Sequence, residues 1–216
     1  MKMRRILSLI TGITILFAIE KEGEFGFSYG FLSKPSYESN DITALSDSSV
    51  IRTGDWLRIN IGYQNKTNFC IVYRNADGGY MKLYSSDEEK ESNQEIVYAY
   101  PLTWLDMEEP IGIETFYFIN TTESLSDLFS MLVRYDKAPP KGKSKLAARI
   151  QEKIDVLDPN AQDDISSIAS RLDKPVTGGV AFRGEEEEGK IKDLSVTHEC
   201  IGTGGIAFQK IVLIHK

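Results

Sequence analysis

Residues 69–84 read FCIVYRNADGGYMKLY, and this stretch predicts a β-hairpin. Its first five residues are continuously apolar, which is typical of a central strand covered on both faces. Residues 75–79 then supply Asn, Asp and Gly, which tolerate positive φ and allow the chain to reverse direction. The return strand follows, with Met81 and Leu83 on one face.

Further strands are predicted on both sides of this hairpin. Residues 57–63 alternate between apolar and polar after the turn signal at residues 53–55, as in a half-buried strand. Downstream, residues 96–100 form a strand that Pro101 ends, and residues 113–119 form a strongly aromatic strand.

Both ends of the chain also contain strand patterns. Residues 25–31 alternate aromatic side chains with Gly and Ser, and we expect an edge strand there because small residues weaken a central position. Residues 177–182, TGGVAF, recur as residues 203–208, TGGIAF, which predicts two strands with similar Gly-led entries. Residues 206–214 form the longer of these, and we expect it to pair with the main sheet.

Three helices are predicted in the second half of the chain. Ser124 and Asp127 have the spacing of a capping box. The first helix then has apolar residues at i, i+3, i+4 and i+7, and residues 137–145 form a linker to the second. The apolar positions of the three helices are Leu125, Leu128, Phe129 and Leu132; Leu146, Ile150, Ile154 and Leu157; and Ile165, Ile168, Ala169 and Leu172.

Together these patterns predict an α+β fold that is mainly β, an antiparallel β-sandwich or curled sheet with about three flanking helices. We expect a β-rich core domain over residues 20–136, a helical pair over residues 137–175, and C-terminal strands over residues 176–216 that pack on the core. Hydrophobic residues make up 41% of the chain, which is enough to bury a core of ordinary size.

The N-terminus has the pattern of an export signal. Lys2, Arg4 and Arg5 precede an apolar run over residues 6–19. As a helix this run is ~21 Å long at ~1.5 Å per residue, short of the about 30 Å of a bilayer core. We therefore predict a signal peptide over residues 1–19, with a poor cleavage site, and an exported protein of the periplasm or cell envelope.

The overall charge bears on the class of partner. The net charge is −7, and it becomes more negative without the basic leader. Nucleic acids and anionic membranes both attract proteins with clustered Lys and Arg. We therefore expect no nucleic-acid partner, and membrane contact only through an uncleaved leader. The acidic run at residues 185–188 is interpreted as a solvated turn rather than a cation site, since it lacks the spaced ligands of a calcium loop.

The middle of the chain resembles a bacterial family, the domain of unknown function 4384, over about residues 49–136. The matching features are the strand opened by residues 53–55, the Phe69–Tyr73 strand, the Asp77-Gly78 turn, Pro101, and residues 110–114. Residues 84–86 depart from the Phe-Pro-Asn that such domains often show there. The resemblance implies a sheet-rich accessory domain of exported bacterial proteins, also found beside caspase-like peptidases and protein kinases. It supplies no catalytic residues.

Few residues offer reactive chemistry. His198, Cys200 and His215 are the candidates for a Cys/His hydrolase or a metal site, and His198 and Cys200 share a face if residues 196–201 form a strand. The sequence around Cys200 lacks the Gln-Ala-Cys setting of a caspase nucleophile. We therefore predict no catalytic residue, no metal site and no cofactor. Cys70 and Cys200 are either a disulfide or, as we favour, two buried thiols.

Aromatic residues offer one alternative to a purely structural role. Six tyrosines of the main block are candidates for a face that binds carbohydrate or peptide, although Tyr is also simply a good strand residue. They are Tyr63, Tyr73, Tyr80, Tyr84, Tyr98 and Tyr100. We expect first a non-enzymatic exported accessory or protein-interaction module with an unknown partner, second a carbohydrate- or peptide-binding module, and as a distant third a Cys/His hydrolase.

Overall fold

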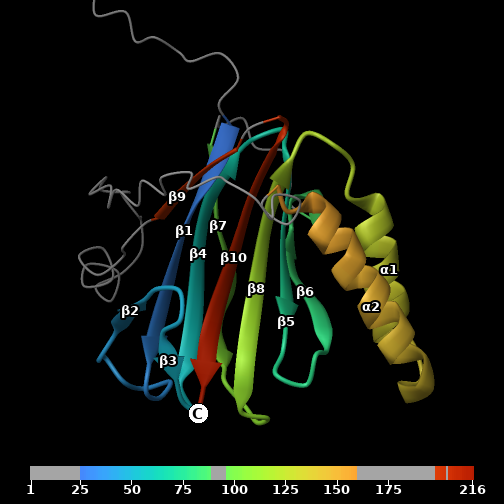
Figure 1. Cartoon of the computed structure of the whole chain (residues 1–216). Helices are drawn as coiled ribbons and strands as arrows, with labels where there is room; N and C mark the ends of the chain where they lie inside the picture. The colour runs from blue at the N-terminus through green and yellow to red at the C-terminus, as the bar shows by residue number, and fades with distance from the viewer. Residues whose placement is uncertain (1–24, 89–95, 160–197, 203) are drawn as a thin grey trace, which may run out of the picture.

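A computed structural model describes residues 25–88, 96–159, 198–202 and 204–216. These residues form three layers, in which two β-sheets face each other and two helices cover the outer face of the second sheet (Figure 1). The fold is α+β and mainly β, as the sequence predicted, and it is an open sandwich rather than a closed barrel.

The first sheet, sheet A, is built around β1 (Phe25–Lys34). This strand pairs with β4 on one side and with both β2 and β9 on the other. The remaining strand, β7, lies beyond β4 at the edge. The bounds of these strands are Thr43–Leu45 for β2, Trp56–Gln64 for β4, Ile96–Asp106 for β7 and His198–Gly202 for β9.

The second sheet, sheet B, has the strand order β3-β10-β8-β5-β6. All its neighbours are antiparallel except β3 and β10, which run parallel over two residue pairs. The bounds are Val50–Ile51 for β3, Asn68–Arg74 for β5, Tyr80–Ser85 for β6, Gly112–Thr121 for β8 and Ile206–His215 for β10. The predicted hairpin of β5 and β6 and the pairing of the C-terminal strand with the main sheet are both confirmed.

An aromatic core fills the space between the two sheets. Phe27 and Phe31 of β1 meet Phe116 and Phe118 of β8 with ring centroids 5.2 to 5.9 Å apart. Alternate residues of β4 complete this inner core from sheet A. Each large ring removes apolar area from water at about 25 cal/mol per Å², so this layer is the main source of cohesion between the sheets.

A second core lies between sheet B and the helices α1 (Ser126–Asp136) and α2 (Pro140–Leu157). Leu128 and Leu132 of α1 and Ile150 and Ile154 of α2 are buried in it. The apolar spacing predicted for these two helices is thus confirmed. β5 is covered on both faces, because Phe69 belongs to the inner core and Val72 to the outer one.

A bulge in β6 decides which core its tyrosines enter. Ile71 pairs with Tyr84 but Val72 pairs with Lys82, so Leu83 is an extra residue in the ladder. Strict alternation would place Tyr80 and Tyr84 on one face. The bulge instead sends Tyr84 to the inner core and Tyr80 beneath the helices. Of the two apolar residues predicted to share a face, Leu83 packs against the inner core, whereas Met81 is 56% exposed.

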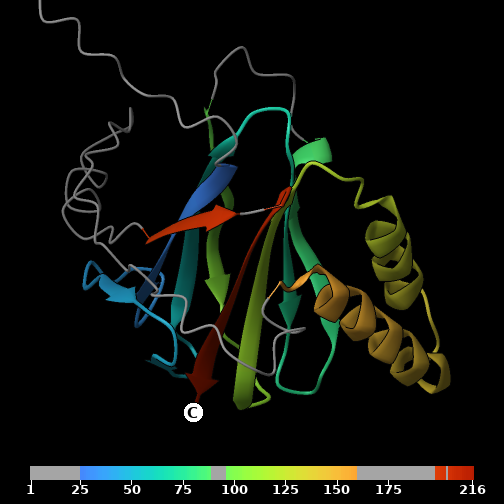
Figure 2. The ribbon, with the colours of Figure 1, turned by 45° about the horizontal axis from the view of Figure 1, so that its top comes forward.

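The expectation that residues 25–31 form an edge strand is wrong, because β1 has partners on both sides. One of its small residues, Gly26, instead leaves space for the backbone of β9. A Cβ on Gly26 would lie 2.2 Å from the carbonyl oxygen of Cys200, so only glycine permits the close approach of β9. Figure 2 shows β9 crossing beside β1 before the chain enters β10 in the other sheet.

The expectation that Pro101 ends its strand is also wrong, since β7 continues to Asp106. Two register shifts interrupt the pairing of β7 with β4, between Leu57 and Ile59 and between Ile59 and Ile61. Proline has no N–H to give to a ladder, and it is tolerated at bulges and on edge strands. β7 meets both conditions, because it is an edge strand and its pairing with β4 is irregular.

The helix starts differ from those predicted. Leu125, not Ser124, is the N-cap of α1, and no side chain caps it, so the capping box is wrong. The Ser124 hydroxyl instead accepts a hydrogen bond from the backbone N–H of Ser126. Residues 140–145 are not a linker, because α2 begins at Pro140, whose fixed φ suits the first helical position.

Several predictions lie outside the described residues. They are the signal peptide over residues 1–19, the helix with apolar positions 165–172, the strand at residues 177–182 and the acidic turn at residues 185–188.

Candidate functional site

The tyrosines proposed as a binding face mostly lie inside the fold. Tyr63 and Tyr84 are buried in the inner core, where their hydroxyl oxygens are 2.7 Å apart. Tyr80 is buried beneath the helices, and Tyr73 packs against the inner core. These four side chains therefore do not form an exposed face, which corrects the prediction; the side chains of the other two tyrosines are not described.

His198 and Cys200 do share one face of β9, since both are partly covered while Glu199 between them is exposed. They make separate contacts, however. The His198 ring stacks on Tyr29 with centroids 5.2 Å apart, and the Cys200 thiol donates to the carbonyl oxygen of Phe208 at 3.5 Å. Burial raises the pKa of Cys200 to about 11. Because the thiolate is the nucleophile, this thiol is not activated at neutral pH.

The two cysteines are free thiols, as we favoured, but only Cys70 is buried, whereas Cys200 is partly covered. Cys70 belongs to the outer core beneath the helices, whereas Cys200 packs against the inner core on the other side of sheet B. Cys70 is fully buried, and burial raises its pKa far above that of an ordinary thiol. Neither cysteine is positioned for a disulfide with the other.

His215 lies with other partners, in a buried polar chain at the end of the sandwich. Its Nδ1 is 3.3 Å from the carboxylate of Glu114, and its Nε2 is 3.1 Å from the hydroxyl oxygen of Thr53. The same carboxylate accepts a hydrogen bond from the hydroxyl of Tyr73 at 2.7 Å. Glu114 and His215 are almost completely buried, whereas Thr53 is exposed.

This hydroxyl–imidazole–carboxylate order is the one that hydrolases use to activate a nucleophile. Such chemistry also needs backbone donors for the oxyanion. The N–H groups around the Thr53 hydroxyl already donate within the fold: that of Thr53 to Lys216, that of Gly54 to Met107 and that of Asp55 to Arg52. We therefore interpret this chain of contacts as structural, because it links the last strand, β10, to β5 and β8.

Three described aromatic residues that belong to neither core, Tyr37, Trp56 and Trp104, lie on the outer face of sheet A. Trp56 precedes Leu57 and Trp104 precedes Leu105, and both leucines pack in or against the inner core, so alternation turns the two indoles outward. Tyr37, in the loop after β1, packs against Trp56, with ring centroids 5.0 Å apart in an edge-to-face arrangement. We call Lys34, Tyr37, Trp56 and Trp104 the tryptophan patch.

Lys34 lies at the centre of the tryptophan patch. Its ammonium is 4.7 Å from the ring centroid of Tyr37 and 4.4 Å from that of Trp104, within the range of cation–π attraction. It also donates to the backbone carbonyl of Tyr37. Lys34 is only 9% exposed, and no carboxylate of the described residues lies within 4.0 Å of its ammonium. Tyr37 is 61% exposed, and the two indoles are half-buried.

The tryptophan patch was missed because its members are far apart in the sequence. Strand pairing assembles it: Lys34 is the register partner of Trp56, which pairs in turn with Asp106 of β7. One signal was available. Trp56 is in step with Arg58 and Asn60, the polar positions of the alternating strand, which predicts that it faces outward.

Near the other end of sheet A, β1, β4 and β9 surround a shallow depression of about 240 Å³. Ser28, Gln64 and Glu199 supply its polar side chains. Within the described part of the chain, no group of three or more His, Cys, Asp and Glu side chains is arranged to hold a metal ion.

Comparison with protein-family models, curated proteins and solved structures finds no match to this chain. The resemblance to the domain of unknown function 4384 therefore stays a prediction. Among the described residues, no helix has the length and apolar character needed to cross a membrane.

Proposed function

We propose that this chain is a non-enzymatic, exported accessory module that binds another molecule of the bacterial cell envelope through the tryptophan patch. The observation that supports this proposal is the position of the two tryptophans. They are the only two in the chain, and neither belongs to the inner or the outer core.

Core packing does not account for this placement. The two cores are built mainly from Phe, Tyr and aliphatic side chains, and neither indole is among their members. Trp and Tyr held at a surface supply large, rigid contact area at low cost in conformational entropy, and they are enriched among residues that dominate binding energy. Lys34 adds a cation that is already ordered by the rings around it.

A carbohydrate ligand is the second candidate for the same surface. Aromatic rings offer apolar faces on which a sugar ring can stack, and polar groups lie next to them on the outer face of sheet A. Arg58 and Asn60, whose side chains are hydrogen-bonded at 3.2 Å, follow Trp56 along β4. An extended peptide remains an alternative ligand of this surface.

The test uses the two indoles as built-in reporters, because both tryptophans of the chain lie in the patch. Envelope proteins and a panel of envelope polysaccharides are titrated while the intrinsic fluorescence is followed. We expect a saturable change that a Tyr37→Ala/Trp104→Phe variant weakens at least tenfold. The matched control is Met81→Ala, which removes an exposed apolar side chain from β6. Equal binding by the patch variant and the control would contradict the proposal.

A further inference from the structure

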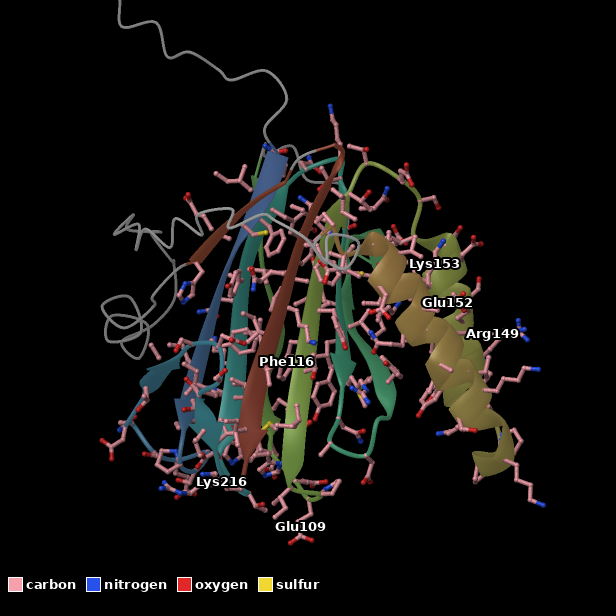
Figure 3. All side chains as sticks on the ribbon, in the orientation of Figure 1. Glu109, Phe116, Arg149, Glu152, Lys153 and Lys216 are labelled. Carbon is pink, nitrogen blue, oxygen red and sulfur yellow. The ribbon has the colours of Figure 1, made fainter. Side chains whose placement is uncertain are left out.

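Helix α2 carries a row of positive charge, although the net charge of the whole chain is −7. Lys141, Lys145, Arg149 and Lys153 recur at every fourth position. Residues at i, i+4 and i+8 form one of the ridges on a helix surface, and this ridge spans roughly 18 Å at ~1.5 Å per residue. Three of the four side chains are exposed and the last is partly covered. Figure 3 shows Arg149 reaching outward from the helical layer.

The row is not neutralised within the described parts of the protein. None of its four cations has a carboxylate of these residues within 4.0 Å. The nearby acids of α2 are Glu152, which is exposed, and Asp155, which accepts a hydrogen bond from Gln151.

Such a row does not help the helix itself. Like charges four residues apart destabilise a helix. Helix α2 is held instead by the burial of Ile150 and Ile154 against sheet B. A surface charge pattern that opposes local stability is therefore better explained by an anionic partner than by folding.

We propose that this row binds the anionic headgroups of a phospholipid bilayer. Lipids diffuse, so they can gather beneath a short row while the acidic remainder of the protein stays in water. A nucleic-acid duplex extends rigidly past the row toward that acidic surface. Val156, three residues after Lys153 and 61% exposed, and Val133 on α1, 50% exposed, are also compatible with a headgroup region.

The location of α2 leaves the tryptophan patch free. The helices cover the outer face of sheet B, and the patch lies on the outer face of sheet A, on the other side of the sandwich (Figure 1). A bilayer beneath α2 and a ligand at the patch therefore do not compete. The inference rests on α2 alone and is independent of the function proposed above.

The experiment compares two variants of the full chain with equal net charge. One variant changes all four residues of the row to Gln, which keeps a good helix propensity. The control changes four exposed cations outside α2 to Gln, namely Arg52, Lys66, Lys210 and Lys216. Both keep the apolar N-terminal segment, which then contributes equally. Binding is measured by co-sedimentation with vesicles of phosphatidylcholine, alone or mixed with phosphatidylglycerol.

We expect the unchanged protein and the control to bind the mixed vesicles, and added salt to weaken this binding. Each Lys or Arg near an anionic surface is worth about fivefold in affinity, so the row variant loses roughly two to three orders of magnitude. If the row variant does not fold, Lys145→Gln/Arg149→Gln makes the same comparison. Equal losses in both variants, equal binding to neutral vesicles, or binding to duplex DNA but not to mixed vesicles would overturn the inference.

Discussion

The carboxylate of Glu114 and the imidazole of His215 lie 3.3 Å apart on the neighbouring strands β8 and β10, and both are shielded from water. This contact joins residues 101 positions apart in the sequence. Burying a carboxylate without hydrogen-bond partners costs free energy. Tyr73 and His215 lower this cost for Glu114, since both contact its carboxylate.

Glu114→Ala removes the carboxylate on which both Tyr73 and His215 depend. Removing the shared acceptor of this buried polar network leaves the Tyr73 hydroxyl and Nδ1 of His215 without that partner, so we expect a loss of about 1–3 kcal/mol in the free energy of unfolding. Urea denaturation measures this loss. Thr53→Val, at the exposed end of the same chain of contacts, should cost less than ~1 kcal/mol. Equal effects of the two changes would refute this account.

Gly26→Ala tests the close approach of β9 to β1. The added Cβ would lie 2.2 Å from a backbone oxygen, and backbone cannot yield as a flexible side chain can. We expect a loss of about 1–3 kcal/mol. The matched change is Gly142→Ala in α2, where the nearest atom is 3.9 Å away; it should stabilise the protein by up to ~1 kcal/mol. Thermal unfolding compares the two, and a neutral Gly26→Ala would show that β9 is not held at this distance.

The thiols provide a pH-dependent test. Burial holds the pKa of Cys200 at about 11, so little thiolate exists near neutral pH. We expect slow alkylation of Cys200 by iodoacetamide, with a rate that increases as the pH rises toward 11. The folded state retains this proton more tightly than the unfolded chain. The resulting stabilisation is therefore complete below the pKa of the unfolded thiol and declines as the pH rises above it. Rapid modification of the folded protein at pH 7 would contradict the burial.

Gln151 connects α2 to sheet B. Its Oε1 accepts hydrogen bonds from the hydroxyls of Tyr80 and Tyr117, so Gln151→Leu leaves two partly buried hydroxyls without that acceptor. We expect a loss of about 1–3 kcal/mol and faster amide hydrogen exchange in α2. Glu152→Ala, its exposed neighbour, should stay within ~0.5 kcal/mol of the unchanged protein. Unchanged exchange in the Gln151 variant would show that the helix is docked by apolar contacts alone.

Local sequence patterns were sufficient to predict those elements that depend on interactions between neighbouring residues. The hairpin of β5 and β6 follows from an apolar run, a Gly-rich turn and a return strand. The helices follow from apolar residues spaced three and four apart, which the backbone geometry itself aligns on one face. Their starts were less predictable, because a capping hydroxyl has alternative partners nearby, as the Ser124–Ser126 contact shows.

The predictions were wrong where contact with a segment distant in the sequence decides the structure. The small residues of β1 suggested a weak edge, but β9 pairs there, and its backbone needs the space that Gly26 leaves. Pro101 suggested a strand end, but the edge position of β7 and its register shifts accommodate it. The tyrosines suggested a binding face, but a one-residue bulge and the facing sheet placed Tyr84 in the inner core and Tyr80 in the outer one.

Alternation and composition by themselves determined that this chain is a mainly β sandwich with amphipathic helices, because period-two and period-3.6 burial are properties of the backbone. Only the tertiary structure decided where its polar and aromatic groups meet. Register brought Trp56 beside Lys34, and strand order brought His215 beside Glu114. Both placements depend on pairings between distant segments, whose energies come from the assembled sheets and not from any local stretch of residues.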